Sequence, residues 1–174
     1  MENKNNYNDL FNPITHKLPY WDELPEIDLY MDQVIVLMEK YLSWYIEYDS
    51  ENKIITPSMI NNYVKLGIMP APIKKKYSKT HIAHLIIICI LKSVIPISEI
   101  KSLIERRIAS SSIEELLNYF VFLFDSTATT VYAINKRFLS KQATCLEDAA
   151  LYMAIGSNVS KYLSQKIINE KYNK

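Results

Sequence analysis

The chain has 174 residues, of which 49% are hydrophobic and 22% charged, and its formal net charge is +1. This length suits one domain with an extension, and the composition excludes a largely disordered chain. Two cysteines are too few for a disulfide framework or a multi-cysteine zinc site. The longest apolar run, residues 85–91, is far shorter than the ~20 residues of a transmembrane helix. The sequence therefore predicts a cytoplasmic protein without a membrane segment.

The first 25 residues are rich in Asn and Pro and are predicted to form an irregular arm. Its apolar side chains are expected to dock on the body of the protein: Leu18, Tyr20, Trp21 and Leu24. Apolar residues then recur at helical spacing, which predicts a helix over 27–47 followed by a polar turn over 48–53.

Thr56 and Pro57 predict the start of the next helix, because Thr can cap it and Pro at the first position lacks only an N–H that would be unpaired. Gly67 predicts its end, since glycine readily adopts the left-handed conformation of a helix cap. The helix is thus expected over 57–66. Two prolines follow, and residues 73–77 are predicted to form an extended, lysine-rich segment.

Four further helices are predicted. Ser78 caps an almost entirely apolar helix over 79–94, which must be central, and a short helix over 98–108 follows. A capping box, Ser112 with Glu115, opens a helix toward Leu139, and the β-branched threonines of 125–130 predict a kink or break in it.

A second capping box, Thr144 with Glu147, opens a last helix over 145–170. The sequence thus predicts a mostly α fold, with a small two-stranded β element near Ile54 and Lys75.

Charge is unevenly distributed along the chain. Residues 1–51 hold eleven acidic residues against three lysines, whereas residues 52–98 hold seven lysines and no acidic residue. A window free of carboxylates is typical of a surface that binds a polyanion. A buried helix within the window would exclude charge of either sign, but it does not explain five of its lysines: Lys65, Lys74, Lys75, Lys76 and Lys79.

The helix over 57–66 carries one polar stripe, Ser58, Asn61, Asn62 and Lys65, at positions i, i+3, i+4 and i+7. Asn is a mediocre helix former, but it pairs bidentately with adenine, and Lys reaches phosphate or guanine. Such a helix followed by a lysine cluster is typical of winged helix-turn-helix proteins that bind DNA. The alternative is an ordinary solvated helix face.

The segments TPSMINNYVKLGIMP and KKKYSKTHIAHLIIICILKSVIPISEIKSLI resemble the DNA-binding module of MerR-type regulators over residues 56–104. Asn62-Tyr63 occupies the place of that family's tyrosine pair, Gly67-Ile68 that of its Gly-Leu, and Tyr77-Ser78 the end of its wing. With LPYWDELPEIDLYMDQVI upstream, residues 18–108 resemble the YkrK-like domain-of-unknown-function family of low-GC Gram-positive bacteria. That resemblance implies a transcriptional repressor.

The chain departs from the MerR-type pattern in three places. YDSENKII fills the position of the first helix, so the helix over 27–47 must support the module instead. The wing lacks the Gly-Tyr-Arg element, and Asn61 stands where that family has Arg. Base specificity therefore cannot be transferred. The expected DNA-binding residues are Ser58, Asn61, Asn62, Tyr63, Lys65, Lys74, Lys75, Lys76, Tyr77 and Lys79.

No constellation indicates catalysis. His81 and His84 have the i, i+3 spacing of a metal pair, but only Cys89 lies near enough in sequence to add a ligand, so ordinary surface or partly buried histidines are favoured. The acidic residues Glu23, Glu26, Asp28 and Asp32 are interpreted as a solvated face. Gly-rich loops and nucleophile motifs are absent from the sequence. We expect no enzyme activity, no cofactor and no metal.

The expected organisation is an arm over 1–25, a MerR-like winged-helix DNA-binding domain over 26–108 and a helical extension over 109–174. Apolar side chains of the extension point in several directions, which indicates a dimer interface or an effector pocket, or a plain helical core. A homodimer is favoured because two-fold symmetric proteins bind palindromic operators. A small-molecule effector is left open.

The sequence thus predicts a sequence-specific DNA-binding transcriptional regulator, with repression the favoured sign. The helix over 57–66 would enter the major groove of double-stranded DNA, and Lys74–Tyr77 would act as the wing. An architectural protein that bends DNA, as excisionases do, is another option in this class. The alternative from a different class is a helical adaptor whose basic face binds an acidic protein.

Overall fold

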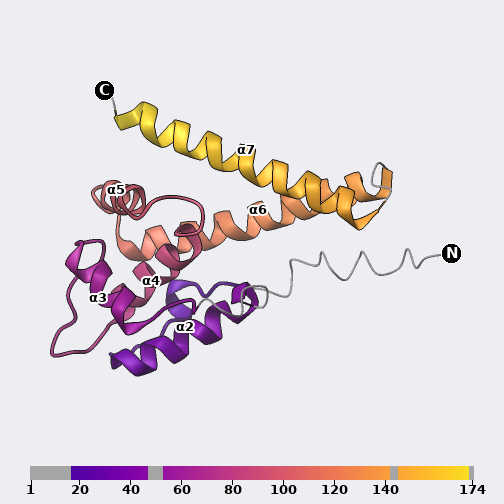
Figure 1. Ribbon diagram of the computed structural model, residues 1–174. Coiled ribbons are helices and arrows are strands. Elements are labelled where there is room, and N and C mark those ends of the chain that lie inside the picture. Colours follow the sequence, from indigo (N-terminus) through magenta and orange to yellow (C-terminus); the bar gives the residue numbers. More distant parts are fainter. Residues whose placement is uncertain (1–16, 47–52, 142–144, 173–174) are drawn as a thin grey trace. The chain divides into compact units, whose positions relative to one another are not determined.

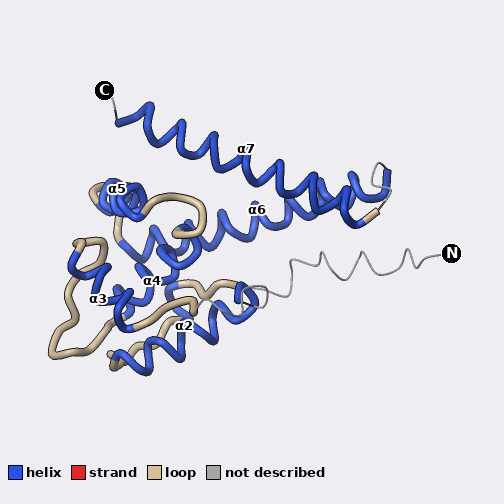
Figure 2. The backbone as a smooth tube through the Cα atoms, in the orientation of Figure 1, coloured by secondary structure: helices blue, strands red, loops and turns tan. Residues whose placement is uncertain are grey.

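The computed structural model describes residues 17–46, 53–141 and 145–172 (Figure 1). These residues form six α-helices and a short 3-10 helix connected by loops, with two isolated β-bridges and no regular strand (Figure 2). The predicted mostly α class is confirmed. The elements are η2 (Trp21–Glu23), α2 (Met31–Ile46), α3 (Pro57–Lys65), α4 (Lys79–Leu91), α5 (Ile97–Ile108), α6 (Ile113–Lys141) and α7 (Leu146–Tyr172).

The described chain divides into two compact units, Lys17–Phe122 and the part from Leu123 onward. The winged-helix domain expected over residues 26–108 lies within the first unit, which begins at Lys17 and ends at Phe122. None of the helices in the described ranges combines the length and the hydrophobicity that crossing a bilayer requires.

Helix α4 is the core of the first unit. Ten consecutive residues, 81–90, are buried, so every face of the helix is covered by protein. A helix that is apolar all round can be stable only at the centre of a fold, and α2 and α5 both pack against α4. The predicted central helix is confirmed, although it ends at Leu91 rather than at residue 94.

The N-terminal arm is anchored to this core. Leu18 and Leu24 are buried, and the Trp21 backbone N–H donates to Asn118 Oδ1 at 2.9 Å. Both leucines therefore dock as expected. Tyr20 is 41% exposed, so for that residue the expectation was wrong.

Helix α2 begins at Met31, four residues later than predicted. Leu29 forms an antiparallel bridge with Tyr77, which keeps the chain extended there. The Tyr30 N–H then donates to Gln33 Oε1 at 2.9 Å. The predicted β element is thus partly wrong: Ile54 takes no part in a bridge among the described residues, and its carbonyl accepts from Lys92 Nζ instead.

Helix α6 starts as predicted and then runs without a break. Glu115 N–H donates to Ser112 Oγ at 3.1 Å, and Ser112 N–H donates to Glu115 Oε2 at 3.0 Å, so the capping box is confirmed. The expected break at 125–130 is wrong, because α6 is continuous from Ile113 to Lys141. The hydroxyls of Thr129 and Thr130 donate to backbone carbonyls four residues earlier, a contact that threonine makes within a helix and that often bends it.

The second unit contains the last part of α6 and all of α7. Phe138 and Tyr152 stack face to face, with ring centroids 3.9 Å apart. Helix α7 runs from Leu146 to Tyr172, two residues beyond the predicted end. Thr144, and with it the second predicted capping box, lies outside the described residues.

Candidate nucleic-acid interface

Hydrogen bonds and a glycine cap fix helix α3 at both ends. Met59 N–H donates to the Thr56 side chain at 3.2 Å, and Pro57 is the first helical residue, as predicted. At the other end Gly67 adopts a φ of 67°, which confirms the left-handed cap. Lys101 Nζ donates to the Leu66 carbonyl at 2.9 Å and satisfies an acceptor that the helix leaves free.

The two faces of α3 differ sharply in polarity. Ile60 and Tyr63 are buried against the first unit. The opposite face is exposed and carries the whole predicted stripe, which consists of Ser58, Asn61, Asn62 and Lys65. The first turn of α3 holds no acidic residue, so the positive end of its dipole is not neutralised from within the helix. This face offers amide and ammonium groups to a ligand in solvent.

The Lys74–Lys75 turn, residues 73–76, follows α3 along the chain. Ile73 and Lys76 exchange two backbone hydrogen bonds, at 3.1 and 2.9 Å. Between them Lys74 and Lys75 adopt positive φ values of 50° and 64°. This is a tight hairpin turn, so the prediction of an extended segment is wrong at these two residues.

Two-residue hairpin turns with positive φ at both positions favour Asn-Gly, because a Cβ disfavours the left-handed conformation. Lysines there carry a strain of about 1–2 kcal/mol each. Strained residues of this kind cluster at functional sites. The Lys74–Lys75 turn is therefore a candidate binding element.

Backbone pairing holds the base of this turn. Tyr77 and Leu29 exchange hydrogen bonds of 2.9 and 2.8 Å, which connect the turn to the segment before α2. The turn and α3 border the same depression of about 490 Å³, which is lined by Tyr30, Met31, Asp32, Ile35, Pro57 and Lys75. The N-terminus of α3 and the tip of the turn thus lie on one side of the first unit.

Two tyrosines expected to contact DNA lie in the core. Tyr63 and Tyr77 are 4% and 3% exposed. Burial raises the pKa of Tyr63 to about 12, with a smaller effect from Cys89, and burial also raises the pKa of Tyr77. We leave both out of the contact surface. The position of Tyr63, three residues after Ile60, already placed it on the apolar face of α3.

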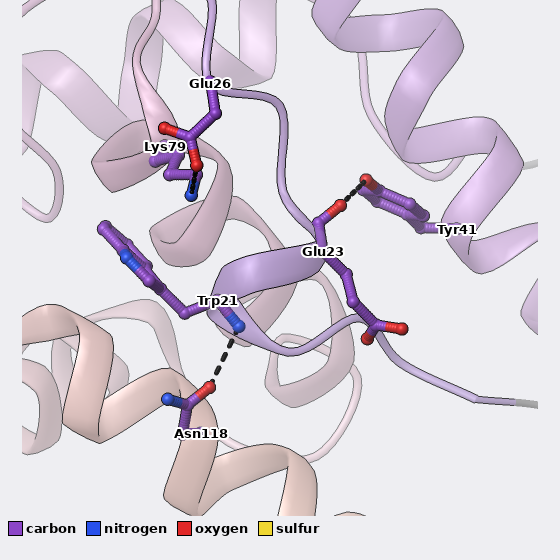
Figure 3. A network of polar contacts seen from close by, with 6 residues as sticks. All are labelled: Trp21, Glu23, Glu26, Tyr41, Lys79 and Asn118. Carbon is purple, nitrogen blue, oxygen red and sulfur yellow. Dashed lines mark hydrogen bonds and ion pairs between the residues drawn. The ribbon is translucent and has the colours of Figure 1, made fainter.

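Lys79 is engaged within the first unit. Its ammonium pairs with the Glu26 carboxylate and lies 5.5 Å from the centroid of the Trp21 ring (Figure 3). Only 14% of its side chain is exposed, so we leave it out of the contact surface as well. Sequence reasoning missed this pair because Glu26 and Lys79 are 53 positions apart.

Arm residues around this pair are also fixed by polar contacts. The Tyr41 hydroxyl donates to the Glu23 carbonyl at 3.4 Å, and Trp21 carries the hydrogen bond to Asn118 (Figure 3). Burial, reinforced by the charge of Glu23, raises the pKa of Tyr41. Glu23 and Glu26 therefore lie within the first unit, where Glu26 contacts the basic segment through Lys79.

The side chains of His81 and His84 are buried and contact backbone groups. Both are only 4% exposed, which corrects the expectation of surface or partly buried side chains. His81 Nδ1 accepts the Ser78 N–H at 2.9 Å, and its Nε2 lies 3.3 Å from the Ala71 carbonyl. His84 Nδ1 lies 2.7 Å from the Thr80 carbonyl. Across the residues that the structure describes, no three potential ligands gather into a metal-binding group.

A protein-family model described as "Domain of unknown function (DUF1836)" matches residues 19–122. The match covers more than half of the chain and nearly coincides with the first compact unit, Lys17–Phe122. No curated protein and no solved structure matches the chain.

Proposed function

This chain belongs to the DUF1836 family, a family described without a function, and from its geometry we propose that it is a sequence-specific DNA-binding transcriptional regulator. One observation carries the proposal: a strained turn of lysines borders the same depression as the N-terminus of α3, the helix whose exposed face carries Asn and Lys. The proposed contact residues are Ser58, Asn61, Asn62, Lys65, Lys74, Lys75 and Lys76, all of which are exposed.

In this proposal α3 is the recognition helix of a MerR-like winged helix-turn-helix core. Asn61 and Asn62 would pair with base edges in the major groove, where an Asn–adenine pair contributes about 1–3 kcal/mol of discrimination. The Lys74–Lys75 turn would act as the wing, on phosphates or in the adjacent minor groove. At the N-terminus of α3 the Ser58 N–H would donate to a phosphate, because Pro57 has no N–H and those of Met59 and Ile60 already donate to Thr56.

Repression in the cytoplasm is the proposed mode of action. It follows from the resemblance of residues 18–108 to YkrK-like proteins, and occupying promoter DNA requires no catalytic group. The proposal accordingly includes no reaction step, cofactor or metal. An effector that modulates binding would be a separate ligand.

Fluorescence anisotropy of a labelled fragment from the region upstream of the protein's own gene tests this function. We expect log K to fall with log salt concentration at a slope of about −3 to −5 per monomer, because each neutralised phosphate releases counterions. The triple variant Lys74/Lys75/Lys76→Ala should lose most of this affinity. The variant Lys17/Lys40/Lys161→Ala removes the same charge elsewhere and should retain most of it.

Two results would count against DNA binding. Folded protein that binds neither this fragment nor random DNA at low salt would exclude it, and the basic surface would then suit an acidic protein partner. Equal losses in the two triple variants would show that only net charge matters. If the first variant alone is affected, Asn61→Ala and Asn62→Ala should reduce binding to the specific fragment more than binding to random DNA.

A further inference from the structure

Ile73, the first residue of the Lys74–Lys75 turn, is 73% exposed, more than any other large apolar side chain among the described residues. The rest of the first unit thus leaves it uncovered. Isolated exposed isoleucines are common on protein surfaces, but the three residues after this one are all exposed lysines. An apolar side chain flanked by cations suits a ligand that is apolar at its centre and anionic at its edges.

Backbone pairing fixes the direction of the Ile73 side chain. Ile73 pairs with Lys76, and the next residue, Tyr77, pairs with Leu29. Residues paired directly across two strands share a face, and neighbours along one strand alternate between faces. Leu29 and Tyr77 are buried in the core, so Ile73 and Lys76 lie on the opposite face, which is exposed to solvent.

Tyr30 lies on the same exposed face and supports Lys76. It follows the buried Leu29 and is 51% exposed. The Lys76 ammonium lies 5.4 Å from the centroid of the Tyr30 ring, a cation–π contact that limits the positions of this charge. Ile73 therefore lies across from a lysine whose ammonium is held beside it, whereas Lys74 and Lys75 form the tip of the turn.

We infer that Ile73 is an apolar wedge that enters the minor groove of double-stranded DNA at a flexible base step, with the neighbouring lysines on the phosphates that line the groove. This inference rests on the proposed DNA binding and adds a class of preferred sequence to it. Apolar side chains that enter the minor groove insert between base pairs and partly unstack them. Unstacking is easiest at pyrimidine–purine steps such as TA, so the bound DNA should carry such a step beneath the turn.

Lysines without a wedge would give the opposite preference. A-tracts are stiff, and their narrow minor groove has an enhanced negative potential that attracts cationic side chains. Two duplexes of equal composition and charge, each of about 30 base pairs, therefore separate the two modes of binding. In one duplex A and T alternate, so that every second step is TA. The other pairs a strand of A with a strand of T and contains no TA step.

Fluorescence anisotropy of the full chain with these two labelled duplexes tests the wedge. We expect the wild type to bind the alternating duplex about three- to tenfold more tightly, because only its TA steps open readily. Ile73→Ala should lose this preference. Ile73→Lys should reverse it while binding the A-tract duplex more tightly than the wild type, because it replaces the wedge by a cation.

Ile27→Ala is the matched control. Ile27 is 71% exposed in the first unit and lies outside the turn, so its truncation should leave the preference for the alternating duplex unchanged. Circular dichroism confirms that the variants fold, which is expected because both isoleucines are largely exposed.

Unstacking can also be observed directly. With 2-aminopurine in place of one central adenine of the alternating duplex, saturating wild-type protein should increase the fluorescence, because this base analogue brightens when it leaves the stack. Ile73→Ala at the same degree of saturation should leave the fluorescence near that of free DNA.

The outcomes distinguish the wedge from DNA binding itself. A wild-type chain that binds the two duplexes equally, or that favours the A-tract duplex, would overturn the wedge and leave DNA binding through the lysines intact. A preference for TA steps that survives Ile73→Ala would overturn it as well. Absence of binding to both duplexes and to the upstream fragment at low salt would instead remove the proposed function, and the wedge with it.

Discussion

His84 lies within α4, and its imidazole is enclosed by protein. Burial lowers its pKa below the usual 6.5; the hydrogen bond to the Thr80 carbonyl opposes this shift, and the nearby His81 adds to it. His81 Nδ1 accepts the Ser78 N–H and its Nε2 lies against the Ala71 carbonyl, so the His81 ring connects α4 to the loop before it. Neither imidazole is exposed to solvent as a surface histidine would be.

The lowered pKa of His84 makes stability depend on pH. Between its lowered folded pKa and the ordinary value of 6.5, the unfolded chain binds more protons than the folded chain, so the free energy of unfolding falls as the pH drops below 6.5. His84→Asn keeps a donor near the Thr80 carbonyl but cannot titrate. We expect denaturant unfolding at pH 7.5 and 5.5 to show a smaller loss for this variant. An identical loss in both proteins would assign the dependence to other groups.

The Lys74–Lys75 turn and α3 are stabilised in different ways. Helix α3 follows from its own caps, since the Thr56 cap alone contributes about 1 kcal/mol. The turn adopts a backbone that its two lysines disfavour, and it is held by the bridge between Leu29 and Tyr77. A strained turn retained at an exposed tip is best explained by the side chains it presents.

Replacing the tip with a favourable turn sequence should separate stability from binding. We expect Lys74→Asn with Lys75→Gly to raise the free energy of unfolding by about 1–2 kcal/mol, because Asn-Gly relieves the strain. The same variant should bind DNA more weakly, with a salt slope about 2 units shallower. Urea denaturation and anisotropy measure the two effects.

Lys74→Ala with Lys75→Ala is the control, because it removes the charges but keeps a Cβ at both strained positions. It should match the Asn-Gly variant in binding and lack its gain in stability. An equal gain in the free energy of unfolding in both variants would show that backbone strain at Lys74 and Lys75 is not its cause.

Within the first unit, residues 26–30 of the acidic stretch contact residues 76–79 of the basic stretch. Glu26 pairs with Lys79, and the Lys76 ammonium lies 5.4 Å from the centroid of the Tyr30 ring. The two oppositely charged stretches of sequence thus meet in space and partly compensate each other. A polyanion approaching the Lys74–Lys75 turn would also meet the carboxylate of Glu26.

Neutralising Glu26 should therefore strengthen DNA binding. We expect Glu26→Gln to raise the affinity about two- to threefold at low salt, with the effect disappearing at high salt as charges are screened. The free energy of unfolding should change by less than about 1 kcal/mol, because Glu26 is largely exposed. Glu39→Gln on α2 makes the same charge change elsewhere. Anisotropy should distinguish the two, and equal effects would exclude a local role for Glu26.

Elements that depend on near neighbours could be predicted from the sequence alone. Thr56 and Gly67 at the ends of α3, and Ser112 with Glu115 at the start of α6, act over three or four positions, so their geometry is visible in the order of residues. The central place of α4 was equally predictable, because a helix without a polar face has no other stable position. The exposed stripe on α3 followed from the same periodicity.

The accessibility of the candidate residues depends on long-range contacts and could not be predicted from the sequence. Tyr77 is paired with Leu29, and Lys79 with Glu26, by contacts between positions about 50 residues apart. The positive φ values of Lys74 and Lys75 depend on the same long-range pairing, against the local preference of lysine. Near-neighbour hydrogen bonds and periodicity are written into the sequence, whereas burial and ion pairing depend on which distant segments meet when the chain folds.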